Sequence, residues 1–140
     1  MFGFTSSTTV MLDLDKISEL KAVRIGVDAL EEFKLGGVVV AESSKRHYHV
    51  IFNRRLSKFK VFSIVSTLCI RLKLEALTKY FLEQSTRGDF TLRISPKGKK
   101  PSPRIVFQYG KQGGEIQNYL QDCELLKSIN KKSRVESLIS

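Results

Sequence analysis

Carboxylates and imidazoles recur at a spacing of two residues in two strand-like segments of this sequence. Asp13 and Asp15 end one alternating segment, and His47 and His49 lie in another. Because alternate residues of a strand point to the same face, each pair projects from one side of a sheet. Two neighbouring carboxylates repel one another unless a cation joins them, and Mg²⁺ or Mn²⁺ accepts such oxygen ligands beside substrate phosphates. These residues indicate metal-assisted chemistry on a phosphate, and the histidines are suited to either the phosphate or the metal.

A third pair, Asp89 and Arg93, is four residues apart and shares one face of a strand predicted at Phe90–Ser95. In isolation, each pair also fits a solvated strand end or a turn. Together, the pairs gather acid, imidazole and guanidinium groups on one surface, which fits a metal–nucleotide site better than three coincidences. This surface consists of Asp13, Asp15, His49, Asp89 and Arg93.

The elements that must position these residues follow the order β-α-β-β-α-β-β-α. Alternating apolar residues predict strands, and apolar residues three or four apart predict helices. The predicted strands are Thr8–Asp15, Val38–Val40, Arg46–Asn53, Phe90–Ser95 and Arg104–Tyr109. The predicted helices are Lys16–Lys34, Leu56–Gln84 (one helix or two) and Glu115–Ile129. This order predicts an α+β fold with an RRM-like, mixed or antiparallel sheet of about five strands. Helices packed mainly on one face would leave the polar face partly open.

Composition and charge favour a nucleic-acid or nucleotide partner. The chain has 140 residues, with 24 Lys or Arg against 14 Asp or Glu, which gives a formal net charge of +10. Such an excess favours DNA, RNA or nucleoside phosphates. Length and a 41% hydrophobic content fit a single domain over residues 1–130, followed by a polar tail at 131–140. The start lacks the pattern of a secretory signal, polar residues interrupt the longest apolar run, and two cysteines lack CxxC spacing. We therefore expect an intracellular, cytoplasmic protein with no membrane association.

The order of the motifs resembles that of the archaeo-eukaryotic primase superfamily, the primase-polymerases. Residues 12–15 (LDLD) are similar to the acidic DxD strand of that family, and residues 44–49 (SKRHYH) to its SxH-type signature. Residues 88–96 (GDFTLRISP) resemble the third motif, an Asp followed by an LR-x-x-P stretch. The resemblance extends from about Val10 to Phe107 and makes His49 the signature histidine, with His47 standing where the family carries glycine.

This resemblance implies metal-dependent nucleotidyl transfer that makes or extends a primer on single-stranded DNA, as in plasmid or viral replication. The implied catalytic and metal-binding residues are Asp13, Asp15 and Asp89, with Mg²⁺ or Mn²⁺ as cofactor. The implied nucleotide-binding residues are Ser44, His49 and Arg93. The implied nucleic-acid contacts are Arg46, Arg54, Arg55, Lys97, Lys99 and Lys100. Implied partners are single-stranded DNA or a primer–template, nucleoside triphosphates and an additional replication subunit.

Two other classes fit part of the pattern. A HUH endonuclease, the initiator of rolling-circle replication, carries an HxH pair on a strand, as in residues 47–49, and a nucleophilic tyrosine on a helix. Tyr80 and Tyr119 lie in predicted helices, although neither is followed by the lysine typical of that class. A non-catalytic RRM-like module would stack bases on exposed sheet aromatics, whereas this face is rich in carboxylates. Loss of activity in Asp13→Asn, or nicking that depends on a tyrosine, would separate these classes.

Overall fold

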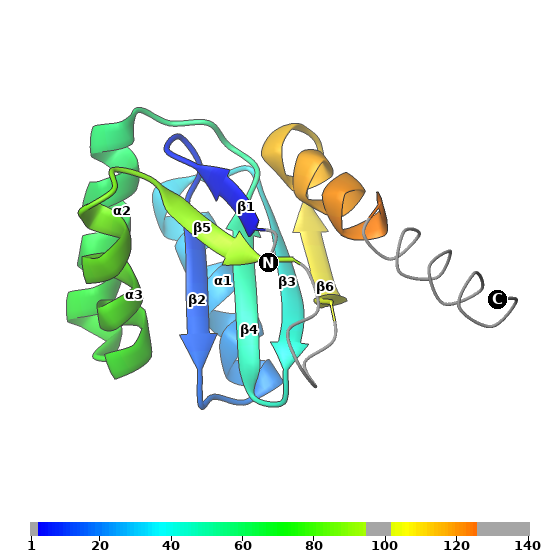
Figure 1. Cartoon of the computed structure of the whole chain (residues 1–140), viewed down its shortest axis with the longest axis horizontal. Coiled ribbons are helices and arrows are strands. Elements are labelled where there is room, and N and C mark those ends of the chain that lie inside the picture. Colours follow the sequence, from blue (N-terminus) through cyan, green and yellow to red (C-terminus); the bar gives the residue numbers. More distant parts are fainter. Residues whose placement is uncertain (1–2, 95–101, 126–140) are drawn as a thin grey trace, which may run out of the picture.

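Four antiparallel strands form the central sheet of the molecule (Figure 1). The computed structural model describes residues 3–94 and 102–125. In spatial order, the strands are β2 (Met11–Asp15), β4 (His47–Phe52), β3 (Gly37–Ser44) and β6 (Arg104–Gly110). Strand β3 contains the valines 38–40, and its five consecutive buried positions are typical of a strand covered on both faces.

Helix α1 (Glu19–Phe33) covers one face of this sheet. Its N-terminus is capped by Ser18, whose side-chain oxygen accepts a hydrogen bond from the Lys21 amide at 3.1 Å. Gly26 lets the helix approach closely, because a Cβ there would lie 3.3 Å from Val38 and 3.4 Å from Val50. The buried aliphatic side chains on this face therefore form the main apolar core with α1.

Two further helices, α2 (Lys58–Leu72) and α3 (Glu75–Ser85), flank the sheet beside β2 (Figure 1). The predicted helical segment between residues 56 and 84 is thus two helices, and the break falls at Lys73, which adopts a left-handed conformation with φ 54°. In the described part of the chain, no helix is both long enough and apolar enough to cross a membrane.

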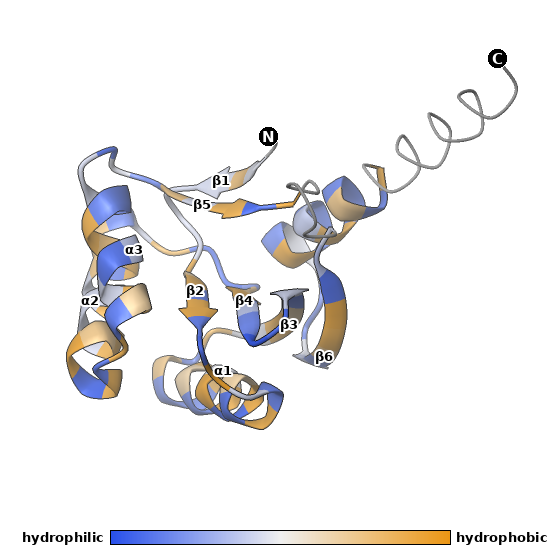
Figure 2. Ribbon diagram, turned by 60° about the horizontal axis from the view of Figure 1, so that its bottom comes forward, coloured by the Kyte–Doolittle hydropathy of each residue, from blue (hydrophilic) through white to orange (hydrophobic). Residues whose placement is uncertain are grey.

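The second face of the sheet is covered by a two-stranded antiparallel sheet and a fourth helix (Figure 2). The small sheet pairs β1 (Gly3–Ser6) with β5 (Phe90–Arg93), and the fourth helix covers residues 114–125. The ring of Tyr119 on this helix packs edge-on against Phe4 of β1, with ring centroids 5.6 Å apart. Helix and small sheet therefore form one cover over this face.

The structure confirms an α+β fold but not a single RRM-like sheet of about five strands. The prediction is wrong because β5 leaves the central sheet and pairs with β1, a strand too short to give a clear alternation. The expected open face is also wrong, since His49, Ser43 and Thr9 on it are at most 2% exposed. The predicted polar tail at 131–140 lies outside the described residues.

Candidate metal centre

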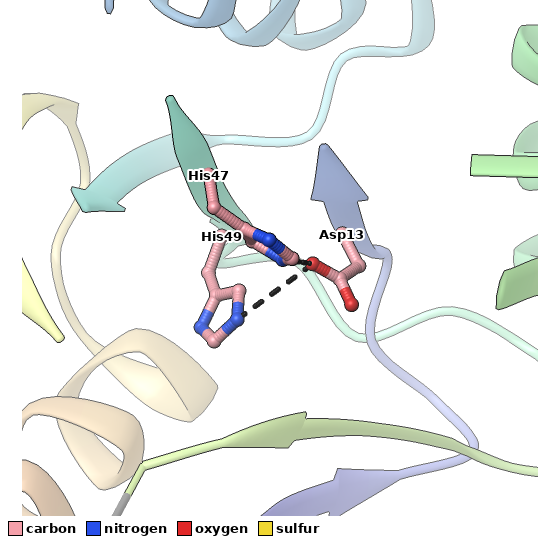
Figure 3. Close-up of side chains that lie close together, drawn as sticks. All are labelled: Asp13, His47 and His49. Carbon is pink, nitrogen blue, oxygen red and sulfur yellow. Dashed lines mark hydrogen bonds and ion pairs between the residues drawn. The ribbon is translucent and has the colours of Figure 1, made fainter. Parts of the chain in front are cut away.

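One carboxylate and two imidazoles converge on the covered face of the central sheet (Figure 3). Strand β2 pairs with β4 so that Asp13 lies opposite His49, and Asp15 opposite His47. Oδ1 of Asp13 lies 2.5 Å from Nε2 of His47 and 3.8 Å from Nε2 of His49. Among the described residues, these three are the one group of His, Cys, Asp or Glu side chains able to share an ion, with ligand atoms within 4.8 Å.

Two tight turns set the register that brings these side chains together. The β3–β4 hairpin turns at Lys45 and Arg46, and the chain leaves β2 at Lys16. Lys16 and Arg46 are left-handed, with φ 58° and 62°, and the amide of Ile17 donates to the Arg46 carbonyl at 3.3 Å. A slip of one residue would send the histidines to the α1 face, so this turn geometry positions the site.

His49 is the buried member of the group, at 2% exposure. Burial lowers its pKa from 6.5 to about 4, although the nearby Asp13 carboxylate acts in the opposite direction. The imidazole is therefore neutral near pH 7 and keeps a lone pair for a metal ion. Its Nδ1 has no hydrogen-bond partner among the described residues, so burial of this side chain contributes little to the stability of the fold.

The donor set fits a divalent transition ion. Imidazole nitrogen favours zinc, iron, nickel and copper, while carboxylate oxygen favours magnesium, calcium and manganese. A centre of two nitrogens and one oxygen suits Mn²⁺ better than Mg²⁺, which prefers an all-oxygen shell. Asp13, His47 and His49 would hold the ion, and Asp15 would orient His47, whose Nδ1 lies 3.4 Å from the Asp15 carboxylate.

Two buried tyrosines approach this centre from different elements. Tyr80 of α3 is 7% exposed, and its hydroxyl has no hydrogen-bond partner among the described residues. Tyr119 of the fourth helix is fully buried, and its hydroxyl interacts with the buried thiol of Cys123. Burial raises the pKa of both phenols well above 10, and the charge of Asp13 contributes in the same direction to each. Both phenols are therefore neutral near pH 7.

Arg93 joins the centre from the covering sheet. It lies on β5, and its Nη2 donates to the Ser43 carbonyl on β3 at 2.9 Å. Burial lowers the pKa of this guanidinium, while Tyr119 and Asp13 raise it. Arg93 thus fastens the cover to the central sheet and adds a positive charge near the carboxylate.

The structure brings together four of the five residues assigned to the active surface: Asp13, Asp15, His49 and Arg93. Asp89 is not in the metal-binding group, because it precedes β5, outside the central sheet, and lies 4.0 Å from Arg87. The prediction of three metal-binding aspartates therefore does not match this geometry. Ser44 lies opposite His47 in the β3–β4 ladder, beside the centre.

The residues predicted to contact nucleic acid separate into different regions. Arg46 lies in the turn next to His47, whereas Arg54 and Arg55 follow the other end of β4. Arg54 donates to the Lys34 carbonyl at 3.1 Å, and Arg55 forms an ion pair with Glu115 at 2.7 Å. The three predicted lysines of the basic loop, Lys97, Lys99 and Lys100, lie outside the described residues.

The primase resemblance gave no role to His47 or to the two tyrosines. The signal for His47 was present in the HxH spacing, and strand pairing with Asp13 decides its role. In comparisons with known proteins, no family model, curated protein or solved structure matches this chain. The arrangement of the site itself therefore carries the functional argument.

Proposed function

We propose that this protein is a metal-dependent endonuclease of the HUH kind, which cleaves a phosphodiester bond in single-stranded DNA. The observation that carries the proposal is the convergence of Asp13, His47 and His49 on one point. The net charge of +10 supports a polyanionic substrate. The two buried tyrosines supply candidate nucleophiles on helices, as this class requires.

The ligand set supports one metal ion rather than two. Two-metal polymerase and nuclease sites hold ions about 3.5–4 Å apart, each stabilising one oxygen of the displacement. Here the third aspartate required by that arrangement, Asp89, lies beside Arg87 instead. A single bound ion would withdraw charge from a non-bridging phosphate oxygen, and Arg93 is placed to offset negative charge in the same region.

Either Tyr80 or Tyr119 would act as the nucleophile. The phenol oxygen forms a bond to phosphorus, the bond from phosphorus to one deoxyribose oxygen breaks, and that oxygen takes up the phenol proton. The product is a strand break with one end joined to the protein through a phosphotyrosine. Because burial raises the pKa of both phenols, each is protonated near pH 7 and must lose its proton during the attack.

A primase-polymerase is the second candidate. It is favoured by the clustering of Asp13, Asp15, His49 and Arg93, four residues that the primase motifs name. In this function, the carboxylates would bind Mg²⁺ or Mn²⁺ with a nucleoside triphosphate, and the product would be an extended primer. The same samples can test both functions.

The deciding experiment incubates end-labelled single-stranded DNA with Mn²⁺ and the wild-type protein, with and without nucleoside triphosphates. We expect strand cleavage and a DNA–protein adduct that survives denaturation, both absent in Asp13→Asn. One of Tyr80→Phe and Tyr119→Phe should abolish the adduct, while Tyr109→Phe, at a position 56% exposed on β6, should not. Primer extension with no adduct would replace the endonuclease by the primase, and the absence of both activities would contradict each proposal.

A further inference from the structure

Three exposed cationic side chains lie in two turns beside the solvent-exposed side of the metal centre. Lys16, Lys45 and Arg46, named here the basic corner, occupy the two turns next to Asp15 and His47. The turns are tied together, since Nη2 of Arg46 donates to the Lys16 carbonyl at 3.3 Å. The basic corner is therefore a single surface built from two segments of the chain.

The basic corner adjoins the side of the centre from which a substrate can enter. Side-chain exposure falls from 36% at Asp15 through 22% at His47 to 3% at His49. The backbone amide of Lys16 donates to the Asp15 carboxylate at 2.8 Å, and Arg46 directly precedes His47. A phosphate bound at the corner would thus stand at the entrance to the centre.

In the described part of the chain, the cations of the basic corner have no carboxylate partner. Elsewhere, four arginines are paired with carboxylates: Arg55, Arg71, Arg87 and Arg104. Within residues 3–94 and 102–125, no carboxylate lies within 4.0 Å of a charged nitrogen of the corner, and the same is true of other exposed cations such as Lys34 and Lys73. Two of its residues also hold the left-handed conformation, which costs a residue with a side chain roughly 1–2 kcal/mol. Lys34 and Lys73 share both properties, so the corner is distinguished by its position beside Asp15 and His47.

We propose that the basic corner binds the phosphate backbone of single-stranded nucleic acid beside the phosphodiester that enters the metal centre. This inference rests on the proposed function and names the substrate contact of the same site. Three cations spread over two turns fit successive phosphates of a strand better than one nucleotide in a closed pocket. Such contacts position the strand without reading its sequence.

The test compares two triple variants that remove the same charge. Lys16→Asn, Lys45→Gln and Arg46→Asn remove the corner, and asparagine tolerates the left-handed conformation. The matched control is Lys34→Asn, Lys73→Asn and Arg24→Gln, because Lys34 and Lys73 are also left-handed, each with φ 54°, and Arg24 is exposed on α1. Circular dichroism and thermal denaturation establish that both variants fold.

Binding of labelled oligothymidylate is measured by anisotropy in EDTA over a range of salt concentrations, so that neither metal nor cleavage is involved. Each phosphate contact on a single strand contributes about 0.7 to the slope of log affinity against log salt. We expect the corner variant to lose about 2 from this slope and at least about tenfold in affinity at low salt. The control variant should change less, and equal losses in the two variants would overturn the proposal.

The two histidines of the chain give a second, local readout. In the wild-type protein, the ring signals of His47 should shift when oligothymidylate is added, and the shift should be absent in the corner variant. DNA binding without movement of these signals would overturn the proposal. The proposal would also be overturned if the corner variant lost binding of deoxythymidine triphosphate but still bound oligothymidylate. These assays do not depend on catalysis, so a protein that binds DNA here but never cleaves it would refute only the proposed endonuclease.

Discussion

The two faces of the central sheet are formed by the same strands, but one is an apolar core and the other carries the candidate site. On the α1 face, Leu12 and Val50 are direct neighbours in the β2–β4 ladder, and both are fully buried. One residue along each strand, Asp13 and His49 are neighbours on the other face, where His49 is also buried. Apolar pairs gain free energy from burial, whereas a buried imidazole with an unpartnered nitrogen loses it.

The polar face is therefore the part of the sheet that contributes less to stability. A carboxylate and two imidazoles under a cover of β1, β5 and a helix are not the arrangement that would maximise stability. Residues that break the local rules for stability often mark a functional site. The contrast between the faces can be tested by changing each of them separately.

The largest effect is expected for His49→Leu on the polar face. The substitution removes one metal ligand. Loss of a residue that only hydrogen-bonds to a ligand lowers metal affinity about 10–100-fold, so loss of a ligand itself should lower Mn²⁺ affinity at least about a hundredfold. The variant should be at least as stable as the wild type without metal, since the unpartnered Nδ1 is removed. Calorimetric titration with Mn²⁺ and urea denaturation in EDTA check these two outcomes. A large loss of stability would show that the polar face is structural.

Leu12→Ala makes the opposite change on the α1 face. The side chain is fully buried, so its truncation should lower the free energy of unfolding by about 3 kcal/mol. Mn²⁺ affinity of the folded variant should stay close to that of the wild type. Urea denaturation and the same calorimetric titration measure both quantities, and a matching fall in Mn²⁺ affinity would show that the faces are coupled.

Acid should weaken the protein through His49 on the polar face. The pKa of His49 is about 4 in the folded state and 6.5 without the fold, so folding opposes protonation. Above pH 6.5, His49 is neutral in both states and its protonation does not affect stability. As the pH drops towards 4, the unfolded state takes up the proton first, so the free energy of unfolding falls by up to about 3 kcal/mol. Urea denaturation in EDTA between these pH values should show the loss in the wild type. His49→Leu should remove that part of the pH dependence, and an unchanged profile in this variant would rule out His49 as its source.

The smallest effects are expected for two ion pairs that join elements packed around the central sheet. Arg55 pairs with the buried Glu115 at the start of the fourth helix, whereas Arg71 of α2 pairs with the exposed Glu32 of α1. Arg55→Gln leaves a buried carboxylate without its partner, so we expect a loss of about 1–3 kcal/mol. Arg71→Gln, the matched control, should cause no measurable change, because an exposed pair contributes little. Thermal denaturation compares the two, and equal effects would contradict the difference in burial.

The sequence alone was sufficient to predict most of the helices and strands and the face to which side chains in the strands point. Alternation in residues 46–53 predicted that His47 and His49 share one face, and the structure confirms this. Local patterns are reliable here because a strand has a period of two residues, and each segment carries its own apolar side.

Tertiary structure decided which of these polar residues meet. Asp13, Asp15 and Asp89 looked equivalent in the sequence, yet β2 pairs with β4, and β5 pairs with β1. Asp13 therefore joins the two histidines, and Asp89 stays with Arg87. The cover that buries His49 depends likewise on contacts between the two ends of the chain, such as Phe4 with Tyr119. No local pattern encodes such pairings, because strand partners far apart in sequence are selected by the packing of the whole core.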